Sequence, residues 1–176
     1  VRGSFHPQHF IPGLKSNSLV EYKNSDVRIL DARIVDTQDR IVNLLEFRNE
    51  YRLLVDIEFG ISADNVAFGL EVNDEKGVRI TTVDSGKMFE QGFHYCVKEG
   101  DAFTLEYYFT SLFRTGLYYA NIGVSSFDGQ QVILNRIVDA LAFKTIKIEG
   151  FSSGYFENIH RMTIDTGKQK RCIEIL

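Results

Sequence analysis

The sequence predicts an all-β protein, an antiparallel β-sandwich of either immunoglobulin-like or jelly-roll topology. Val, Ile, Phe, Tyr and Thr, which favour a pleated surface, make up about 35% of the 176 residues. Apolar residues recur at every second position along several runs, which is the period of a strand. With 14 glycines and only 2 prolines, the turns depend mostly on Gly, Asn and Asp.

The first half of the chain supplies the first five predicted strands. Residues 27–36 and 41–47 are β-rich runs joined by a short polar connection, which indicates a hairpin. Residues 51–59 alternate, with apolar side chains at the odd positions. Residues 65–73 and 78–83 are joined by a polar turn that ends in glycine, so we expect a second hairpin here.

The second half follows a long loop and completes a set of about nine strands. The loop has about 15 to 20 residues, longer than usual in a compact domain, and is therefore a candidate functional segment. Residues 103–109 and 117–125 again alternate between apolar and polar side chains. An Asp-Gly turn precedes residues 132–138, and residues 141–148 form the last predicted strand.

Two flanking segments fall outside this sandwich, which we expect to occupy residues 25–149. Residues 1–24 show no sustained period and are interpreted as a linker or an expression remnant. Residues 150–176 form a C-terminal appendage that ends in the apolar run Cys172-Ile173-Glu174-Ile175-Leu176. Such a run is costly to leave in water, so we expect it to pair with a sheet edge, either of its own sandwich or of a second subunit.

Charge and cysteine content exclude several classes of protein. There are 20 Lys and Arg residues against 24 Asp and Glu, so the chain has no basic field that would hold nucleic acid. No apolar run approaches the ~20 residues that span a bilayer, and the start carries no secretory signal, so we expect a cytoplasmic domain. Cys96 and Cys172 match no metal-binding or redox spacing and are expected to be reduced thiols.

A search for reaction chemistry finds no complete motif. Ser85-Gly86-Lys87-Met88 lacks both the first glycine and the final hydroxyl of a phosphate-binding loop. His94 lies in a polar loop with no orienting acid beside it, so it is a weak candidate for a general base. The predicted strands carry no clustered histidines for a metal. We therefore expect no catalytic residue, no metal and no cofactor.

Polar residues instead suggest a binding surface on three of the predicted strands. They alternate with core residues, so three adjacent strands would display them on one face. An exposed tyrosine offers a platform for a sugar ring, while Asn, Glu and Arg make directed hydrogen bonds to hydroxyls or to an anionic substituent. The alternative is an ordinary solvated sheet face. The candidate carbohydrate-binding residues are Glu71, Asn73, Arg79, Tyr119, Asn121 and Ser125.

Residues 21–146 resemble the C-terminal domain of Wzt-type ABC-transporter ATPase subunits. The resemblance rests on Glu21-Tyr22 before Val27, on the run from Asn73 to Thr82, on Gly116-Leu117-Tyr118-Tyr119, and on the closing run from Val138 to Phe143. Lys23 and Thr81 depart from the glycine and the asparagine that the family often has at the matching positions.

The resemblance implies a non-catalytic carbohydrate-binding module that recognises O-antigen polysaccharide of lipopolysaccharide for export. It implies a homodimer, with an ATPase domain and a membrane subunit as further partners, at the cytoplasmic face of the bacterial inner membrane. On this basis we expect Tyr119 to contact a sugar ring and Arg79 to engage an acidic cap. Two other functions stay open, a glycan-active enzyme domain and a structural or protein-interaction sandwich.

Overall fold

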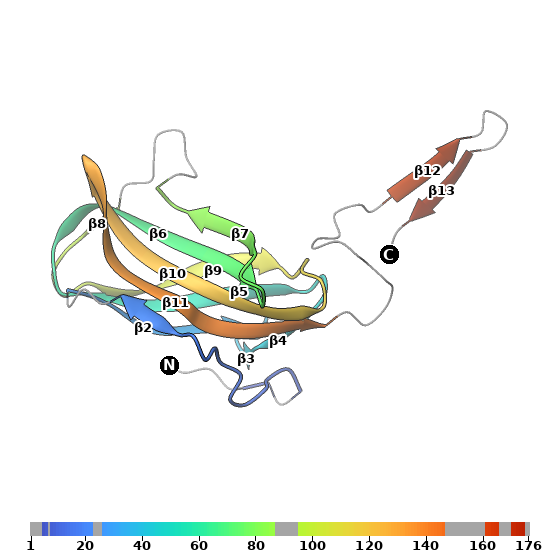
Figure 1. Cartoon of the computed structure of the whole chain (residues 1–176), viewed down its shortest axis with the longest axis horizontal. Coiled ribbons are helices and arrows are strands. Elements are labelled where there is room, and N and C mark those ends of the chain that lie inside the picture. The colour runs from blue at the N-terminus through green and yellow to red at the C-terminus, as the bar shows by residue number, and fades with distance from the viewer. Residues whose placement is uncertain are drawn as a thin grey trace.

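The computed structural model describes residues 5–6, 8–22, 26–86, 95–146, 161–165 and 170–174. Two β-sheets pack face to face, which confirms the predicted sandwich (Figure 1). The smaller sheet has the strand order β3-β2-β5-β9, and the larger sheet has the order β1-β11-β10-β6-β7 with β4 paired to β11 and β8 paired to β6. The strands of the sandwich are β1 (Val20–Tyr22), β2 (Val27–Val35), β3 (Ile41–Val42), β4 (Leu44–Glu46), β5 (Glu50–Phe59), β6 (Ala63–Asp74), β7 (Arg79–Asp84), β8 (Tyr95–Val97), β9 (Ala102–Thr110), β10 (Gly116–Asp128) and β11 (Gln130–Ile146).

The core follows from the alternation that the sequence displays. Along β5 every second side chain, from Tyr51 to Phe59, is buried, and the residues between them are partly exposed. The facing strands β6 and β10 bury Val72 and Ile122 against it. One end of the core is aromatic, because Tyr118 stacks on Phe143 with ring centroids 5.6 Å apart. The interior is therefore a dry layer between the two sheets, and the polar face of each sheet points outward.

The predicted strand 41–47 is in fact two short strands in different sheets. β3 pairs with β2, whereas β4 pairs in parallel with β11. The change of sheet occurs at Asn43, which is buried between them and whose side chain exchanges two hydrogen bonds with the backbone of Ile11. Both parts are short and mostly apolar, so the sequence pattern did not reveal the crossing.

The two last predicted strands, 132–138 and 141–148, form the single strand β11. The register shifts opposite Ala120 and Ile122, and Asp139 takes a positive φ of 55° at this bulge. The Asp139 N–H donates a hydrogen bond to Oδ1 of Asn121 on β10. The bulge interrupts the regular pairing of β11 with β10, so one long strand had the appearance of two short ones in the sequence.

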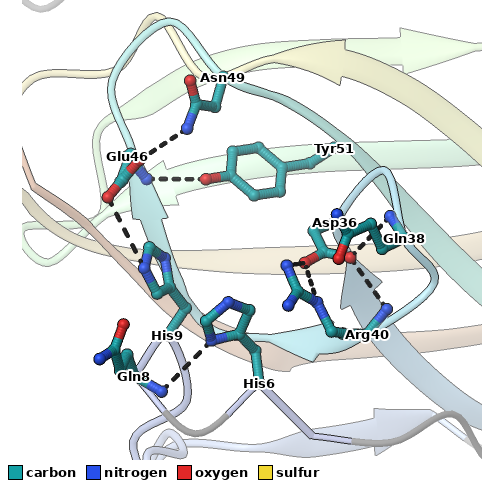
Figure 2. A network of polar contacts seen from close by, with 9 residues as sticks. All are labelled: His6, Gln8, His9, Asp36, Gln38, Arg40, Glu46, Asn49 and Tyr51. Carbon is teal, nitrogen blue, oxygen red and sulfur yellow. Dashed lines mark hydrogen bonds and ion pairs between the residues drawn. The ribbon is translucent and has the colours of Figure 1, made fainter.

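The described part of residues 1–24 is bound to the sandwich, which differs from the predicted linker. The backbone N–H of His6 donates to the carbonyl of Ile41, and the carbonyl of His9 accepts from the N–H groups of Asn43 and Leu44. Figure 2 shows His6 and His9 of this segment beside the turn that follows β2 and the strand β4. Residues 20–22 add β1 to the edge of the larger sheet. Backbone hydrogen bonds hold this segment on the sandwich, and the periodicity of the side chains in the sequence gives no sign of such bonds.

The C-terminal appendage contains a hairpin of β12 (Arg161–Asp165) and β13 (Lys170–Glu174), which form a sheet of their own. The first three residues of the predicted apolar run, Cys172 to Glu174, therefore lie in a strand whose described partner is β12. Its pairing with a sandwich edge or a second subunit stays a prediction. The strand β8 lies in the predicted long loop, and residues 87–94, which include His94, lie outside the described residues.

Candidate functional site

The outward face of the larger sheet carries all six of the predicted binding residues. Directly opposed residues of an antiparallel pair point to the same face, so the register sorts outward side chains into rows across the sheet. Arg79 on β7 lies opposite Asn73 on β6. From one end of β6 and β10 to the other, the rows are Asn73 with Tyr119, Glu71 with Asn121, Gly69 with Gly123, and Ala67 with Ser125.

Glu71 is the centre of a hydrogen-bond network on this face. Its Oε1 accepts from Nδ2 of Asn121 at 2.9 Å and from Nδ2 of Asn73 at 3.1 Å. Its Oε2 lies 2.6 Å from Nε of Arg79. Asn121 is fixed from its other side, because its Oδ1 accepts from the Asp139 N–H at 2.7 Å. These groups hold one another in place, which reduces the entropy lost when a ligand binds.

The network keeps Glu71 ionised at neutral pH. Partial burial by itself raises the pKa of this carboxyl group, but the hydrogen bonds from Asn121 and Asn73 and the charge of Arg79 outweigh it. The pKa of Glu71 therefore lies below its ordinary value of 4.5. An ionised carboxylate only accepts hydrogen bonds, so it offers its remaining lone pairs to hydroxyl donors.

Beside this network the sheet face is hollowed, with a volume of about 590 Å³. Its floor contains Gly69 and Gly123, which are direct partners on β6 and β10 and carry no side chain. Asp84 on β7 lies opposite Gly69, and Arg136 on β11 lies opposite Gly123, so charged side chains of opposite sign flank the floor. A hollow of this size, lined by apolar surface and a few convergent polar groups, is typical of a small-molecule site.

The predicted residues divide into two groups around this hollow. Glu71, Arg79, Asn121 and Ser125 line it, and Ser125 also accepts a hydrogen bond from Gln131 at 3.2 Å. Asn73 and Tyr119 lie in the adjacent row of the sheet and do not line it, although Asn73 supports Glu71.

The floor of the hollow and its charged flanks were not predicted from the sequence. Gly69 and Gly123 carry no polar group and so were not selected as candidates. Counting two residues back from Glu71 and two forward from Asn121 would have found both. The position of Arg136 could not be predicted by such counting, because its pairing with Gly123 depends on the bulge in β11.

A second polar hollow of about 540 Å³ lies where the N-terminal segment meets the turn after β2. Figure 2 shows that its side chains bond to one another. Asp36 accepts from the backbone and side chain of Arg40, and Glu46 accepts from Asn49 at 2.7 Å and lies 3.6 Å from His9. The polar side chains of this hollow are already satisfied by one another. We therefore assign the hollow to the anchoring of the N-terminal segment.

A third cleft, of about 430 Å³, opens between the edge strands β7 and β9. It is lined mainly by apolar side chains such as Leu53, Leu70 and Phe113. The hydroxyl of Tyr107 is buried here with no hydrogen-bond partner among the described residues, and burial raises the pKa of this phenol. Such a cleft offers few hydrogen bonds to a sugar.

Other chemical signals are sparse in the part of the chain that the structure describes. Within it, no three His, Cys, Asp or Glu side chains gather as they would around a metal ion, and no helix is long and apolar enough to cross a membrane. Cys96 is an exposed free thiol, and a hydrogen bond with Asp64 raises its pKa. The side chain of Cys172 lies outside the described residues.

Comparison with known proteins identifies the family. The model of the Wzt C-terminal domain family matches residues 19–157, which begin just before β1 and include the whole sandwich. The chain belongs to the Wzt C-terminal domain family. This family is non-catalytic and is associated with O-antigen ABC transporters. The inclusion of β1 in the match agrees with the place of residues 20–22 in the sheet.

The fold agrees with this membership. A crystal structure described as the C-terminal domain of Wzt superposes with a TM-score of 0.74 at 17% sequence identity, over 82% of this chain and 87% of that chain. A structural-genomics target named SoR45 is 12% identical, with a TM-score of 0.37 over 78% of this chain and 97% of that one, and supports no argument. No curated protein matches the chain. The Wzt C-terminal sandwich is thus retained at low sequence identity.

Proposed function

We propose that this chain binds O-antigen polysaccharide during export, through the outward face of the larger sheet. The observation that supports this most directly is the hollow beside Glu71, which lies on a preorganised polar face of a Wzt C-terminal domain. A sugar ring buries little area and presents many hydroxyls, so its affinity is modest and hydrogen bonds set its specificity. Carboxylate, amide and guanidinium groups around a floor without side chains suit such a ligand.

The state of the carboxylates favours binding over glycoside hydrolysis. A glycosidase needs a general acid whose pKa is raised so that it keeps its proton. Glu71 has the opposite property, because two amides and Arg79 hold its pKa low. The network therefore supports a stationary acceptor of hydrogen bonds, and a proton donor to a leaving group is not expected.

The same proposal extends to assembly and location. The domain works as a homodimer at the cytoplasmic face of the inner membrane, together with an ATPase domain and a membrane subunit. The open edges of the sandwich, such as β7 and β9, offer unpaired backbone groups to a strand of the C-terminal appendage from a second copy. Sedimentation equilibrium of the full chain and of a chain that ends at Gly150 tests this. We expect the full chain to be a dimer and the truncated chain to be a monomer. The same oligomeric state for both would contradict a role of the appendage.

The binding proposal is tested by titrating the full chain with a panel of bacterial O-polysaccharides, followed by backbone NMR with product formation monitored in the same samples. We expect saturable shifts on β6, β7 and β10 and no product. Glu71→Gln should weaken binding. Glu106→Gln is the matched control, because Glu106 also pairs with an arginine, Arg52, at 3.0 Å, but on the smaller sheet. Absence of binding to every glycan, or an equal effect of both variants, would contradict the proposal.

A further inference from the structure

We infer that the paired glycines Gly69 and Gly123 form the floor on which one neutral pyranose residue lies flat, with Asp84 and Arg136 contacting its two ends. This inference rests on the proposed function and specifies which sugar class the hollow accepts. It adds four residues to the site that the alternation of polar side chains did not select.

The strand register places four residues in one row across the sheet. Gly69 and Gly123 are direct Cα partners, and Asp84 and Arg136 continue the same row on the outer strands β7 and β11. Neighbouring strands lie about 4.8 Å apart, so the two glycines clear roughly 10 Å of the sheet face of side chains. This opening matches the breadth of a single pyranose ring with its equatorial hydroxyls. Backbone can be approached this closely only where no Cβ stands in the way.

Both glycines have room for a side chain. A Cβ added to Gly69 would meet its nearest neighbours, backbone oxygens of Gly123 and Val83, at 3.9 Å. A Cβ added to Gly123 would meet the backbone oxygen of Asn135 at 4.0 Å. Both are ordinary contacts, and neither glycine has the positive φ that only glycine tolerates well. Protein packing therefore does not require glycine at these two positions. The effect of the two glycines is that the hollow stays free of side chains.

The hollow is lined by equal numbers of positive and negative side chains. The ionisable side chains that line the hollow are Glu71, Arg79, Asp84 and Arg136, so the formal charges cancel. Glu71 and Arg79 neutralise each other at 2.6 Å. Among the described residues, the side chain of Arg136 makes no hydrogen bond or ion pair, although its positive charge also acts on Glu71. Asp84 uses Oδ1 for the Gly86 N–H. A carboxylate at one end and a guanidinium at the other accept from and donate to sugar hydroxyls, with no excess charge for an acidic sugar.

The test adds single methyl groups to the floor. Gly69→Ala and Gly123→Ala should keep the fold and lift the ring from the sheet, which forfeits dispersion contacts and hydrogen-bond geometry. We expect each to raise the Kd of a neutral O-polysaccharide about tenfold. Gly116→Ala is the matched control on β10, since its Cβ would also make an ordinary contact, 3.6 Å from Tyr118, away from the hollow. Circular dichroism and denaturation of all three variants verify the fold.

The outcomes separate this inference from the proposed function. If wild-type protein binds no glycan, the proposed function fails and this inference falls with it. If wild-type protein binds but Gly69→Ala and Gly123→Ala bind as well as Gly116→Ala does, the floor is wrong while the proposed function stands. Tighter binding of uronic-acid-containing polysaccharides than of neutral ones would overturn the assignment to a neutral sugar. Wild-type affinity for a neutral polysaccharide should change little with salt, whereas a steep dependence would contradict the charge argument.

Discussion

Replacement of Asn121 by alanine should cost more stability than its small size suggests. Asn121 is 5% exposed and links two parts of the larger sheet, because it donates to Glu71 at 2.9 Å and accepts from the Asp139 N–H at 2.7 Å. Loss of a hydrogen bond to a charged group costs about 1.5–3 kcal/mol, and an N–H left without an acceptor adds about 1 kcal/mol. We expect Asn121→Ala to lower the free energy of unfolding by about 2–4 kcal/mol.

Urea denaturation at neutral pH measures this loss, with an unchanged m-value showing that the folded and unfolded states keep their exposed surfaces. Asn73→Ala is the control. It removes a 3.1 Å bond to the same carboxylate, but it also removes a buried Oδ1 that has no partner among the described residues, which offsets part of the loss and leaves a cost of about 1 kcal/mol. A loss below about 0.5 kcal/mol for Asn121→Ala, or one equal to that of Asn73→Ala, would refute the reasoning. Asn121→Asp extends the test, because a second carboxylate beside Glu71 should destabilise the fold at neutral pH and do so less as the pH falls.

Two further predictions concern Glu71 and the N-terminal segment. Because the folded-state pKa of Glu71 is depressed, its stabilisation is present above the ordinary value of 4.5 and is lost as the pH falls through the lower folded value. The difference in unfolding free energy between wild type and Glu71→Gln should therefore be constant near neutral pH and shrink in acid, and a constant difference across the range would be inconsistent with this. Asn43→Ala removes both side-chain bonds to Ile11, of 2.6 and 2.9 Å, and should cost about 1–3 kcal/mol and speed hydrogen exchange in residues 8–14. Asn49→Ala, at an exposed bond to Glu46, should leave that exchange unchanged, and equal exchange in both variants would argue against anchoring by Asn43.

The sheets were predictable where one face of each strand is buried. Residues 51–59 and 65–73 alternate because they pack on the core from one side, and both were located to within two residues. The missed elements obey other rules. β1 and β8 are three-residue strands at the margins of the larger sheet, too short to show a period, and the β3–β4 crossing depends on the hydrogen bonds of Asn43.

The candidate site was predictable only in part, for a related reason. Alternation assigns Glu71 and Asn121 to one face, and the pairing of β6 with β10 confirms that they are neighbours. It cannot report that Arg79 is already paired with Glu71, because that contact depends on side-chain conformation across a register shift. The floor of the hollow consists of Gly69 and Gly123, which have no side chains, so a search for polar side chains does not select them.

The alternation along β6 and β10 also has a consequence for evolution. Inward residues such as Val72 and Ile122 are constrained by the core, whereas outward residues in the same strands have no part in its packing. Substitutions at outward positions away from the Glu71 network can therefore accumulate without loss of the sandwich, which fits the retention of this fold at 17% identity. A lineage can change the chemistry of its outer sheet face by exchanging a few alternate residues, while the scaffold that presents them is inherited intact.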